Sequence, residues 1–135
     1  MAMKWALAQL FRYNGKPFSF EGEYDFTDYI KDDADILKIS PAKVSGVGRC
    51  IKDDHYEFNI HIECVMTLEC SLTLEPVDYK INLDVTEDFD KVESSEDVNI
   101  ISGNTIDLKD VVWQNIYLEK PMRIVKAEYE ATQKN

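Results

Sequence analysis

Apolar and polar residues alternate along thirty consecutive positions of this chain, from Tyr56 to Val85. As far as Leu74 the apolar residues stand at even positions, and Val65 is the single apolar residue among the odd ones. At Pro76 the phase reverses, and the apolar residues then stand at odd positions. A period of two indicates strand with one dry and one wet face, whereas a helix would scatter this pattern around its circumference. The stretch therefore predicts a sheet in which the even row up to Leu74 is buried and the odd row is exposed.

The alternating stretch is too long to form one flat strand. Twenty residues at about 3.3 Å each would span roughly 65 Å, which exceeds the width of a domain of 135 residues. We therefore expect a bend or break between Val65 and Thr67, where the outer row is least polar. Asp53 and Asp54 are predicted to form the hairpin turn that leads into the stretch.

Shorter strands are predicted on the N-terminal side of the alternation. Their expected ranges are Lys4–Phe11, Phe18–Phe26 and Val44–Ile51, and residues 36–39 with Pro41 lead into the last of them. Gly46 and Gly48 in the last of these indicate a bulge or a close approach of the backbone. Between the second and third strands, Thr27 and Asp28 can cap a short helical turn that runs to Lys31.

One helix is predicted near the C-terminus. Asp107 is the expected N-cap, and the helix should run to about Lys120 because Pro121 cannot continue it. Its apolar stripe comprises Leu108, Val111, Val112 and Ile116. Trp113 and Tyr117 lie beside the stripe, where they belong either to the core or to a binding patch.

Together these elements predict a single α+β domain over residues 1–135. We expect a strongly twisted antiparallel sheet, either open or partly closed like a barrel, with one main helix near the C-terminus. The chain is long enough to bury roughly 68% of its unfolded surface, so it should fold without a metal or a disulfide. Residues 87–103 are predicted to form an acidic loop and residues 122–135 a tail.

The chain is strongly acidic, with 26 Asp and Glu residues against 15 Lys and Arg residues and a net charge of −11. Seven acids stand in residues 21–35 with Lys31 as the only cation, and six stand in residues 87–97 with Lys91 as the only cation. Affinity for nucleic acid depends on cations that neutralise phosphates, and this composition lacks that footprint. The clusters are either solvated loops that keep the domain soluble or an acidic face for a basic partner such as a ribosomal protein.

The residue pattern does not favour a catalytic or metal site. The candidate ligands are His55, His61, Cys64 and Cys70. Alternation puts both histidines on the wet face and both cysteines on the dry face, so one ion cannot meet all four. Cys64 also lacks the adjacent base or positive surroundings that a nucleophile needs. The sequence has no glycine-rich phosphate loop. We therefore expect no catalytic residues, no cofactor, no metal and no small-molecule substrate.

The cellular compartment follows from the same composition. No apolar run is long enough to predict a membrane span, and no secretory signal pattern stands at the N-terminus. Three cysteines, an odd number, do not indicate a disulfide framework. We expect a cytoplasmic protein with reduced thiols and no membrane partner.

Three segments, taken in order, carry a family resemblance. The first is Lys4-Trp5 through Gln9-Leu10, followed by Gly15-Lys16-Pro17-Phe18. The second is Leu37-Lys38-Ile39-Ser40-Pro41 with Val44-Ser45-Gly46, followed by Cys70-Ser71-Leu72-Thr73-Leu74-Glu75-Pro76-Val77. The third is Ile106-Asp107-Leu108 with Leu118-Glu119-Lys120-Pro121-Met122-Arg123. Over nearly the whole chain they resemble the YceD family of large ribosomal RNA subunit accumulation proteins, in its shorter Gram-positive form.

The resemblance singles out a set of motif residues. They are Cys70, Thr73, Leu74, Glu75, Asp107, Leu108, Lys120, Pro121 and Arg123. Leu72 stands where the family pattern has an arginine, and Thr73 stands where many members have a second cysteine. A role that depends on that arginine or on a cysteine pair therefore does not carry over to this chain.

The family resemblance implies a role in accumulation of the large ribosomal RNA subunit and hence in ribosome assembly. We expect a non-catalytic factor whose acidic surface contacts a basic ribosomal protein or assembly factor, so that ribosomal RNA is contacted indirectly. The alternative is a direct RNA-binding protein with a local basic patch near Arg123 and Lys126.

Overall fold

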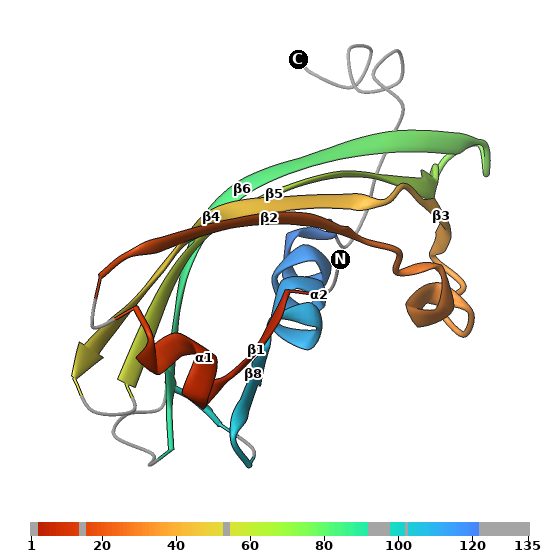
Figure 1. Cartoon of the computed structure of the whole chain (residues 1–135). Helices are drawn as coiled ribbons and strands as arrows, with labels where there is room; N and C mark the ends of the chain where they lie inside the picture. The colour runs from red at the N-terminus through yellow and green to blue at the C-terminus, as the bar shows by residue number, and fades with distance from the viewer. Residues whose placement is uncertain (1–2, 14–15, 53–54, 92–97, 102, 122–135) are drawn as a thin grey trace.

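A computed structural model describes residues 3–13, 16–52, 55–91, 98–101 and 103–121. Its elements in chain order are β1 (Lys4–Ala6), α1 (Leu7–Phe11), β2 (Phe18–Tyr24), the 3₁₀-helix η1 (Thr27–Ile30), β3 (Ile36–Ile39), β4 (Ala42–Lys52), β5 (His55–Glu69), β6 (Pro76–Asp90), β7 (Val98–Ile100), β8 (Thr105–Asp107) and α2 (Lys109–Glu119). Figure 1 shows a strongly curved sheet whose hollow side holds α1, the β1–β8 pair and α2. The predicted α+β fold, with a curled, half-closed sheet and a C-terminal helix, is confirmed.

The sheet is built around β5. Its strand order is β2-β4-β5-β6-β7, and β3 pairs with β5 beyond the end of the β4 pairing. These pairings are antiparallel except that of β6 with β7, which is parallel. β1 and β8 form a separate antiparallel pair. The predicted hairpin turn at residues 53–54 lies outside the described residues, and the strands on either side of it pair antiparallel.

β5 buries its even row over its whole length, as predicted. The buried side chains are Tyr56, Phe58, Ile60, Ile62, Cys64, Met66 and Leu68, each at most 7% exposed. They lie in one hydrophobic core with residues of β2, α1, β8 and α2. The alternation in sequence therefore forms the boundary between the core on the hollow side and solvent on the outer side.

The break in the alternating stretch lies in the turn of residues 70–75, so the predicted break at residues 65–67 is wrong. The N–H of Leu74 donates to the carbonyl of Cys70 at 2.9 Å within this turn. Leu72 and Leu74 are 41% and 68% exposed, so the burial of the even row ends at Cys70. The phase reversal in the sequence marks the start of β6.

Val65 is apolar because β5 changes one of its neighbours there. β5 pairs with β4 as far as Glu63 and with β3 from Met66 onward. Ser40 lies between β3 and β4 and bridges the change: its Oγ accepts from Val65 N–H at 2.8 Å, and its own N–H donates to the Val65 carbonyl at 2.9 Å. Thr67 is 8% exposed although it belongs to the outer row. The low polarity of the outer row there accompanies the change of neighbour from β4 to β3, and β5 continues without a break to Glu69.

Gly46 and Gly48 mark a close approach rather than a bulge, since the register of β4 with β5 runs evenly through both. A Cβ at Gly48 would lie 2.6 Å from the ring of Phe18 and 2.8 Å from the ring of Phe58. A Cβ at Gly46 would lie 2.0 Å from the carbonyl oxygen of Asn59. The two glycines therefore leave room under β4 for aromatic rings of the core.

The first predicted strand is wrong in its second half. Only three residues form β1, and α1 begins at Leu7. The side chain of Gln9 reaches back, and its Oε1 accepts from the N–H of Ala6 at 2.9 Å. Such a contact at the third helical position favours a helix start over continued strand.

The predicted helical turn after β2 is confirmed as η1, but its cap is different. The N-cap position is Phe26, which makes no side-chain cap, and Asp25 just before it meets the first residue of the turn. Its Oδ1 accepts from the N–H of Thr27 at 2.9 Å and from the Thr27 hydroxyl at 2.5 Å. These hydrogen bonds lower the pKa of the Asp25 carboxyl, because they favour its charged form.

Residues 87–103 do not form one loop, contrary to the prediction. β6 continues beyond Glu87, and β7 lies parallel beside its end. The carboxylate of Glu87 accepts from the side-chain amides of Asn99 and Asn115, each at 2.8 Å. This acid therefore joins β6 to β7 and to α2 instead of facing solvent in a loop. Residues 92–97 lie outside the described residues.

α2 confirms the predicted helix and its buried stripe. It begins at Lys109 with Leu108 at the N-cap position, whereas the predicted cap, Asp107, ends β8. Asp107 still meets the start of the helix, since its Oδ1 accepts from the N–H of Lys109 at 3.0 Å. The aromatic residue Trp113 packs on Phe26 with ring centroids 5.2 Å apart, so it belongs to the core. Tyr117 is 44% exposed.

Candidate interaction surface

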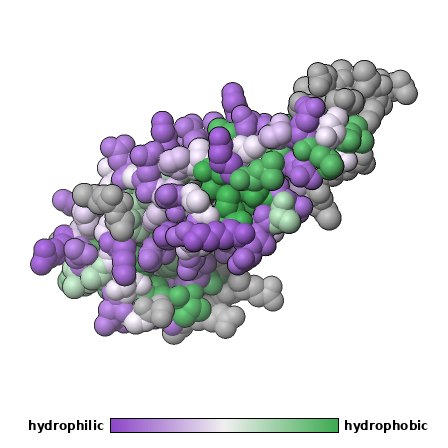
Figure 2. Space-filling model, turned by 90° about the vertical axis from the view of Figure 1, so that its right-hand side faces the viewer, coloured by the Kyte–Doolittle hydropathy of each residue, from purple (hydrophilic) through white to green (hydrophobic). Residues whose placement is uncertain are grey.

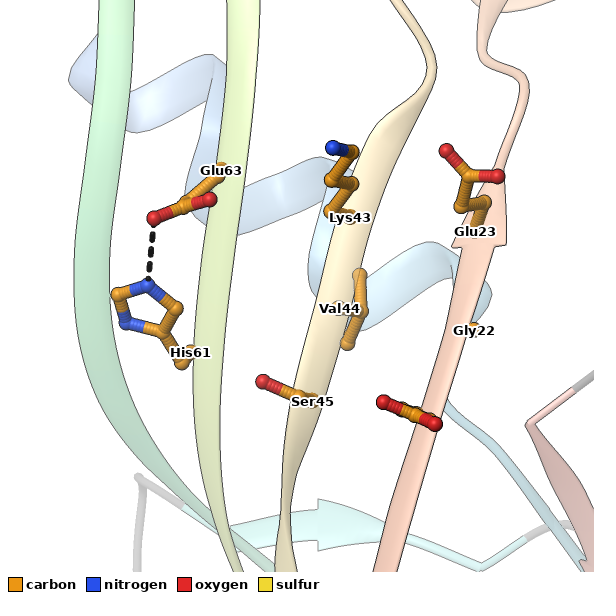
Figure 3. A pocket seen from close by; sticks show the side chains of 8 residues that line it. Gly22, Glu23, Lys43, Val44, Ser45, His61 and Glu63 are labelled. Carbon is orange, nitrogen blue, oxygen red and sulfur yellow. Dashed lines mark hydrogen bonds and ion pairs between the residues drawn. The ribbon is translucent and has the colours of Figure 1, made fainter.

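The outer, convex face of the sheet carries the odd row of β5 and the side chains that stand beside it on neighbouring strands. The strand register forms one row of Glu23, Lys43, Glu63 and Asn82, and a second row of Glu21, Ser45, His61 and Asp84. Figure 3 shows part of both rows around a shallow pocket, with side chains from three adjacent strands. Residues far apart in sequence thus form one continuous polar surface.

His61 joins two strands of this surface. Its Nδ1 lies 2.7 Å from Oδ1 of Asp84, and its Nε2 lies 3.1 Å from Oε1 of Glu63. The hydrogen bonds to Glu63 and to Asp84 raise the pKa of the imidazole above its ordinary value. Below that pKa an imidazolium bridges two carboxylates, and above it the surface becomes more negative.

Acids outnumber bases on the described part of this face. The acids are Glu21, Glu23, Glu57, Glu63, Glu69, Asp78, Asp84, Asp88 and Asp90, and the bases are Lys38, Lys43, Arg49 and Lys80. Arg49 is already engaged, with its Nη2 2.8 Å from Oε1 of Glu57. The face therefore attracts cationic groups and repels phosphates.

The shallow pocket between the two rows has the same character. Its lining includes three carboxylates, those of Glu21, Glu23 and Glu63, together with Lys43 and His61. Because carboxylates are in excess and the pocket is open to solvent, it suits a lysine or arginine side chain better than a phosphate group.

The predicted separation of the histidines from the cysteines is confirmed. Cys64 faces the core, and burial raises the pKa of its thiol to about 11. This thiol is therefore protonated near neutral pH, and a protonated thiol is neither a nucleophile nor a metal ligand. His55 stands on the outer face, with Nδ1 3.1 Å from Oδ2 of Asp90. Among the described residues, no group of three His, Cys, Asp or Glu side chains could hold a metal ion.

The motif residues in the turn of residues 70–75 form an exposed tip of the sheet. Leu74 adopts a φ of 63°, a left-handed conformation that costs free energy for any residue with a Cβ. Cys70 is fully buried beneath the tip, and the Oγ of Thr73 accepts from the N–H of Glu75 at 3.3 Å. Seen from the side that carries β3 and this turn, apolar groups interrupt the polar surface (Figure 2).

The other motif residues hold α2 in place. Leu108 is fully buried, and its N–H donates to the carbonyl of Met3 at 3.2 Å. Nζ of Lys120 donates to Oδ2 of Asp35 at 3.2 Å. Partial burial lowers the pKa of Lys120, but the hydrogen bond to Asp35 and the field of Asp33 outweigh it, so the pKa is raised. Pro121 follows the end of the helix.

The structure does not bring all motif residues into one site. One group lies in the β5–β6 turn and the other at the two ends of α2. Arg123 and Lys126, the predicted basic patch, lie outside the described residues. In the part of the chain that the structure describes, no helix is long and apolar enough to cross a membrane.

Sequence analysis missed the cross-strand rows, which contain the chemistry of the outer face. Alternation showed that Glu63 and Asp84 are exposed, but parity does not show which residues on other strands stand beside them. The missing information was the register between strands, which depends on the positions of the turns. The turn at residues 70–75 was misplaced, so the contact of His61 with Asp84 could not be predicted.

Fold and surface together define a small acidic α+β domain with an open, polar sheet face. A family model described as large ribosomal RNA subunit accumulation protein YceD matches residues 58–135. The uncharacterized protein YlbN of Bacillus subtilis (strain 168) is 35% identical over 127 residues, which cover 90% of this chain and 73% of that protein. The chain belongs to the YceD family. No solved structure gives a significant match.

Proposed function

We propose that this protein supports accumulation of large-subunit ribosomal RNA in the cytoplasm as a non-catalytic factor, through binding of a basic ribosomal protein or assembly factor. The acidic surface makes the contact, and ribosomal RNA is reached through the bound partner. The observation that carries the proposal is the excess of carboxylates on the outer sheet face of a YceD-family domain.

The physical argument rests on the sign of the charge. A protein that binds RNA neutralises phosphates with lysines and arginines, and those side chains form a positive surface before assembly. A face with exposed Glu21, Glu23, Glu63 and Asp84 attracts such a surface over a distance of about 8–10 Å at moderate salt. The same face repels free RNA. A folded acidic domain can therefore cover a basic protein until RNA replaces it.

The test is a pair of titrations at matched ionic strength. The purified protein is titrated against protein-free large-subunit ribosomal RNA and against RNA-free large-subunit ribosomal proteins. We expect weak binding to the RNA and clear binding to one or more basic proteins, with an affinity that falls as salt rises.

Two charge-reversal variants localise the contact. Glu63→Lys with Asp84→Lys alters the outer face and should weaken binding to the basic protein. Asp32→Lys with Asp33→Lys makes the same charge change in the η1–β3 loop and should have a smaller effect. Tight, salt-sensitive binding to protein-free RNA that Arg123→Ala and Lys126→Ala abolish would overturn the proposal in favour of direct RNA binding.

A further inference from the structure

The long strand β6 lies at a margin of the curved sheet (Figure 1). Along one edge it pairs with β5 from Pro76 to Phe89. Along the opposite edge, among the described residues, it pairs with β7 only from Asp88 to Asp90. In an antiparallel strand every second residue points its N–H and its C=O away from the neighbour. Over residues 76–87 those groups face outward without a strand to meet them in the described part of the chain.

Sheet edges of this kind are templates for another strand, and proteins block them with bulges, prolines, lysines or short length. β6 has little of this protection. Its register with β5 is uninterrupted over the whole pairing. Pro76 stands at its first residue, and Lys80 is its single cation. What the outer face of this part of the edge does carry is acid, at Asp78 and Asp84.

The acids determine which strand can be added. In an antiparallel pairing of β6 with β6 of a second copy centred on Ile81, Asp78 and Asp84 would stand opposite each other, and like charges across a strand pair are destabilising. Opposite charges across a strand pair are stabilising. Asp84 is 83% exposed at its side chain. Its Oδ1 meets Nδ1 of His61 at 2.7 Å, and a carboxylate can accept from a second cation as well. The edge therefore favours an extended segment with lysines or arginines at alternate positions and disfavours its own copy.

On the hollow face of the sheet, β6 offers apolar contact as well. Val77, Tyr79, Leu83 and Val85 alternate with the acids and are only half buried, whereas Ile81 between them is buried. A strand added beside β6 would place its own alternate side chains next to this row and cover it. The partner segment should therefore alternate basic and apolar residues.

We propose that the free edge of β6 binds an extended segment of a partner protein, with Lys or Arg alternating with apolar residues, as an additional strand. The inference rests on the proposed function and deepens it, because it names the part of the acidic surface and the form of the basic partner. Backbone hydrogen bonds supply the alignment, and the acids at residues 78 and 84 select for basic segments.

The probe is a synthetic decapeptide in which Lys or Arg alternates with Val, added to the full-length protein. Amide hydrogen exchange is followed by NMR along β6. In the free protein every second amide of residues 77–87 should exchange rapidly, and those amides should become protected in the complex. The β5-facing amides should be protected in both states. An acidic peptide with Glu for Lys and Arg should not bind, nor should the basic peptide with N-methyl groups on alternate amides.

Matched variants separate the edge from general electrostatics. Asp78→Lys with Asp84→Lys should weaken binding of the decapeptide roughly tenfold, since each reversal replaces a favourable cross-strand pair by a repulsive one. Glu21→Lys with Glu23→Lys makes the same charge change on β2, at the opposite margin of the sheet, and should change the affinity less than twofold. Equal weakening by both pairs, or binding without protection of β6 amides, would overturn the proposal.

Other occupants of the edge give different results. Protection of the outward amides in the free protein at every concentration would mean that the chain covers its own edge, and the proposal would fail. Protection that grows with protein concentration would mean a second copy, and it would fail likewise. If RNA-free ribosomal proteins bind while β6 remains unprotected, the edge proposal fails and the proposed function stands. If the decapeptide protects β6 while the ribosomal proteins do not bind, the proposed function fails and the edge proposal stands.

Discussion

The two faces of β5 are made by neighbouring residues of one strand and obey different rules. On the inner face each even residue touches the core, and its place was evident from the alternation. On the outer face each odd residue meets partners on other strands, such as His61 with Asp84. Burial depends on one residue's polarity, whereas a surface row depends on the register of several strands. The inner face therefore carries stability, and the outer face is the surface for which we propose recognition.

The largest expected effect comes from adjacent substitutions on the two faces. Ile62 is fully buried, so Ile62→Ala should lower the free energy of unfolding by about 2–5 kcal/mol through lost transfer energy and an unfilled cavity. Glu63→Ala should change it by less than about 0.5 kcal/mol, as expected at an exposed site. Urea denaturation of both variants measures the difference. Similar losses for the two would contradict the assignment of the faces.

A smaller effect is expected where β4 covers the aromatic core. Gly48→Ala would place a methyl group against the rings of Phe18 and Phe58 and should destabilise the fold by about 1–3 kcal/mol through overpacking. Ser45→Ala, on the outer face of the same strand, serves as the control and should be nearly neutral. An unchanged stability of the glycine variant, measured by urea denaturation, would show that the rings yield without cost.

The turn of residues 70–75 is an exception to this difference between the faces, because Leu72 and Leu74 are exposed although they belong to the even row. Leu74 has a φ of 63° and little contact, so Leu74→Gly should raise stability by about 1 kcal/mol as the left-handed strain is removed. Leu72→Gly, an equal change without positive φ, should lower stability by roughly 0.5–1 kcal/mol through backbone entropy. Thermal denaturation of both variants is the measurement. A loss at both positions would show that Leu74 is held by contacts rather than strained.

The smallest effect is a pH dependence on the outer face. The pKa of His61 is raised in the folded protein, so its contribution to stability is fully present below the unfolded pKa of about 6.5. That contribution is lost as pH rises through the higher folded pKa. The melting temperature of the wild type should exceed that of His61→Asn at acidic pH, and the gap should narrow toward alkaline pH. A gap that widens with pH would contradict the ion pairs with Glu63 and Asp84.

Several features were decided by tertiary contacts that no local pattern contains. The weak alternation of residues 7–11 predicted a strand, yet this segment forms α1. Residues 87–90 look like an acidic loop, yet Glu87 is held by two asparagines from β7 and α2. A bend or break was predicted near Val65 from the low polarity of the outer row. In the structure β5 continues there, and its neighbour changes from β4 to β3.

The sequence by itself determined the fold class, the buried row of β5, the C-terminal helix and its stripe, and it left a bulge or a close approach open at the two glycines. It could do so because alternation, helical spacing and glycine act within a few residues of chain. Only the tertiary structure decided the position of the β5–β6 turn, the parallel pairing of β7 with β6, the rows on the outer face and the edge of β6 that no described strand covers. These depend on register, and register is selected by the sum of many distant contacts, each too weak to leave a mark in the local sequence.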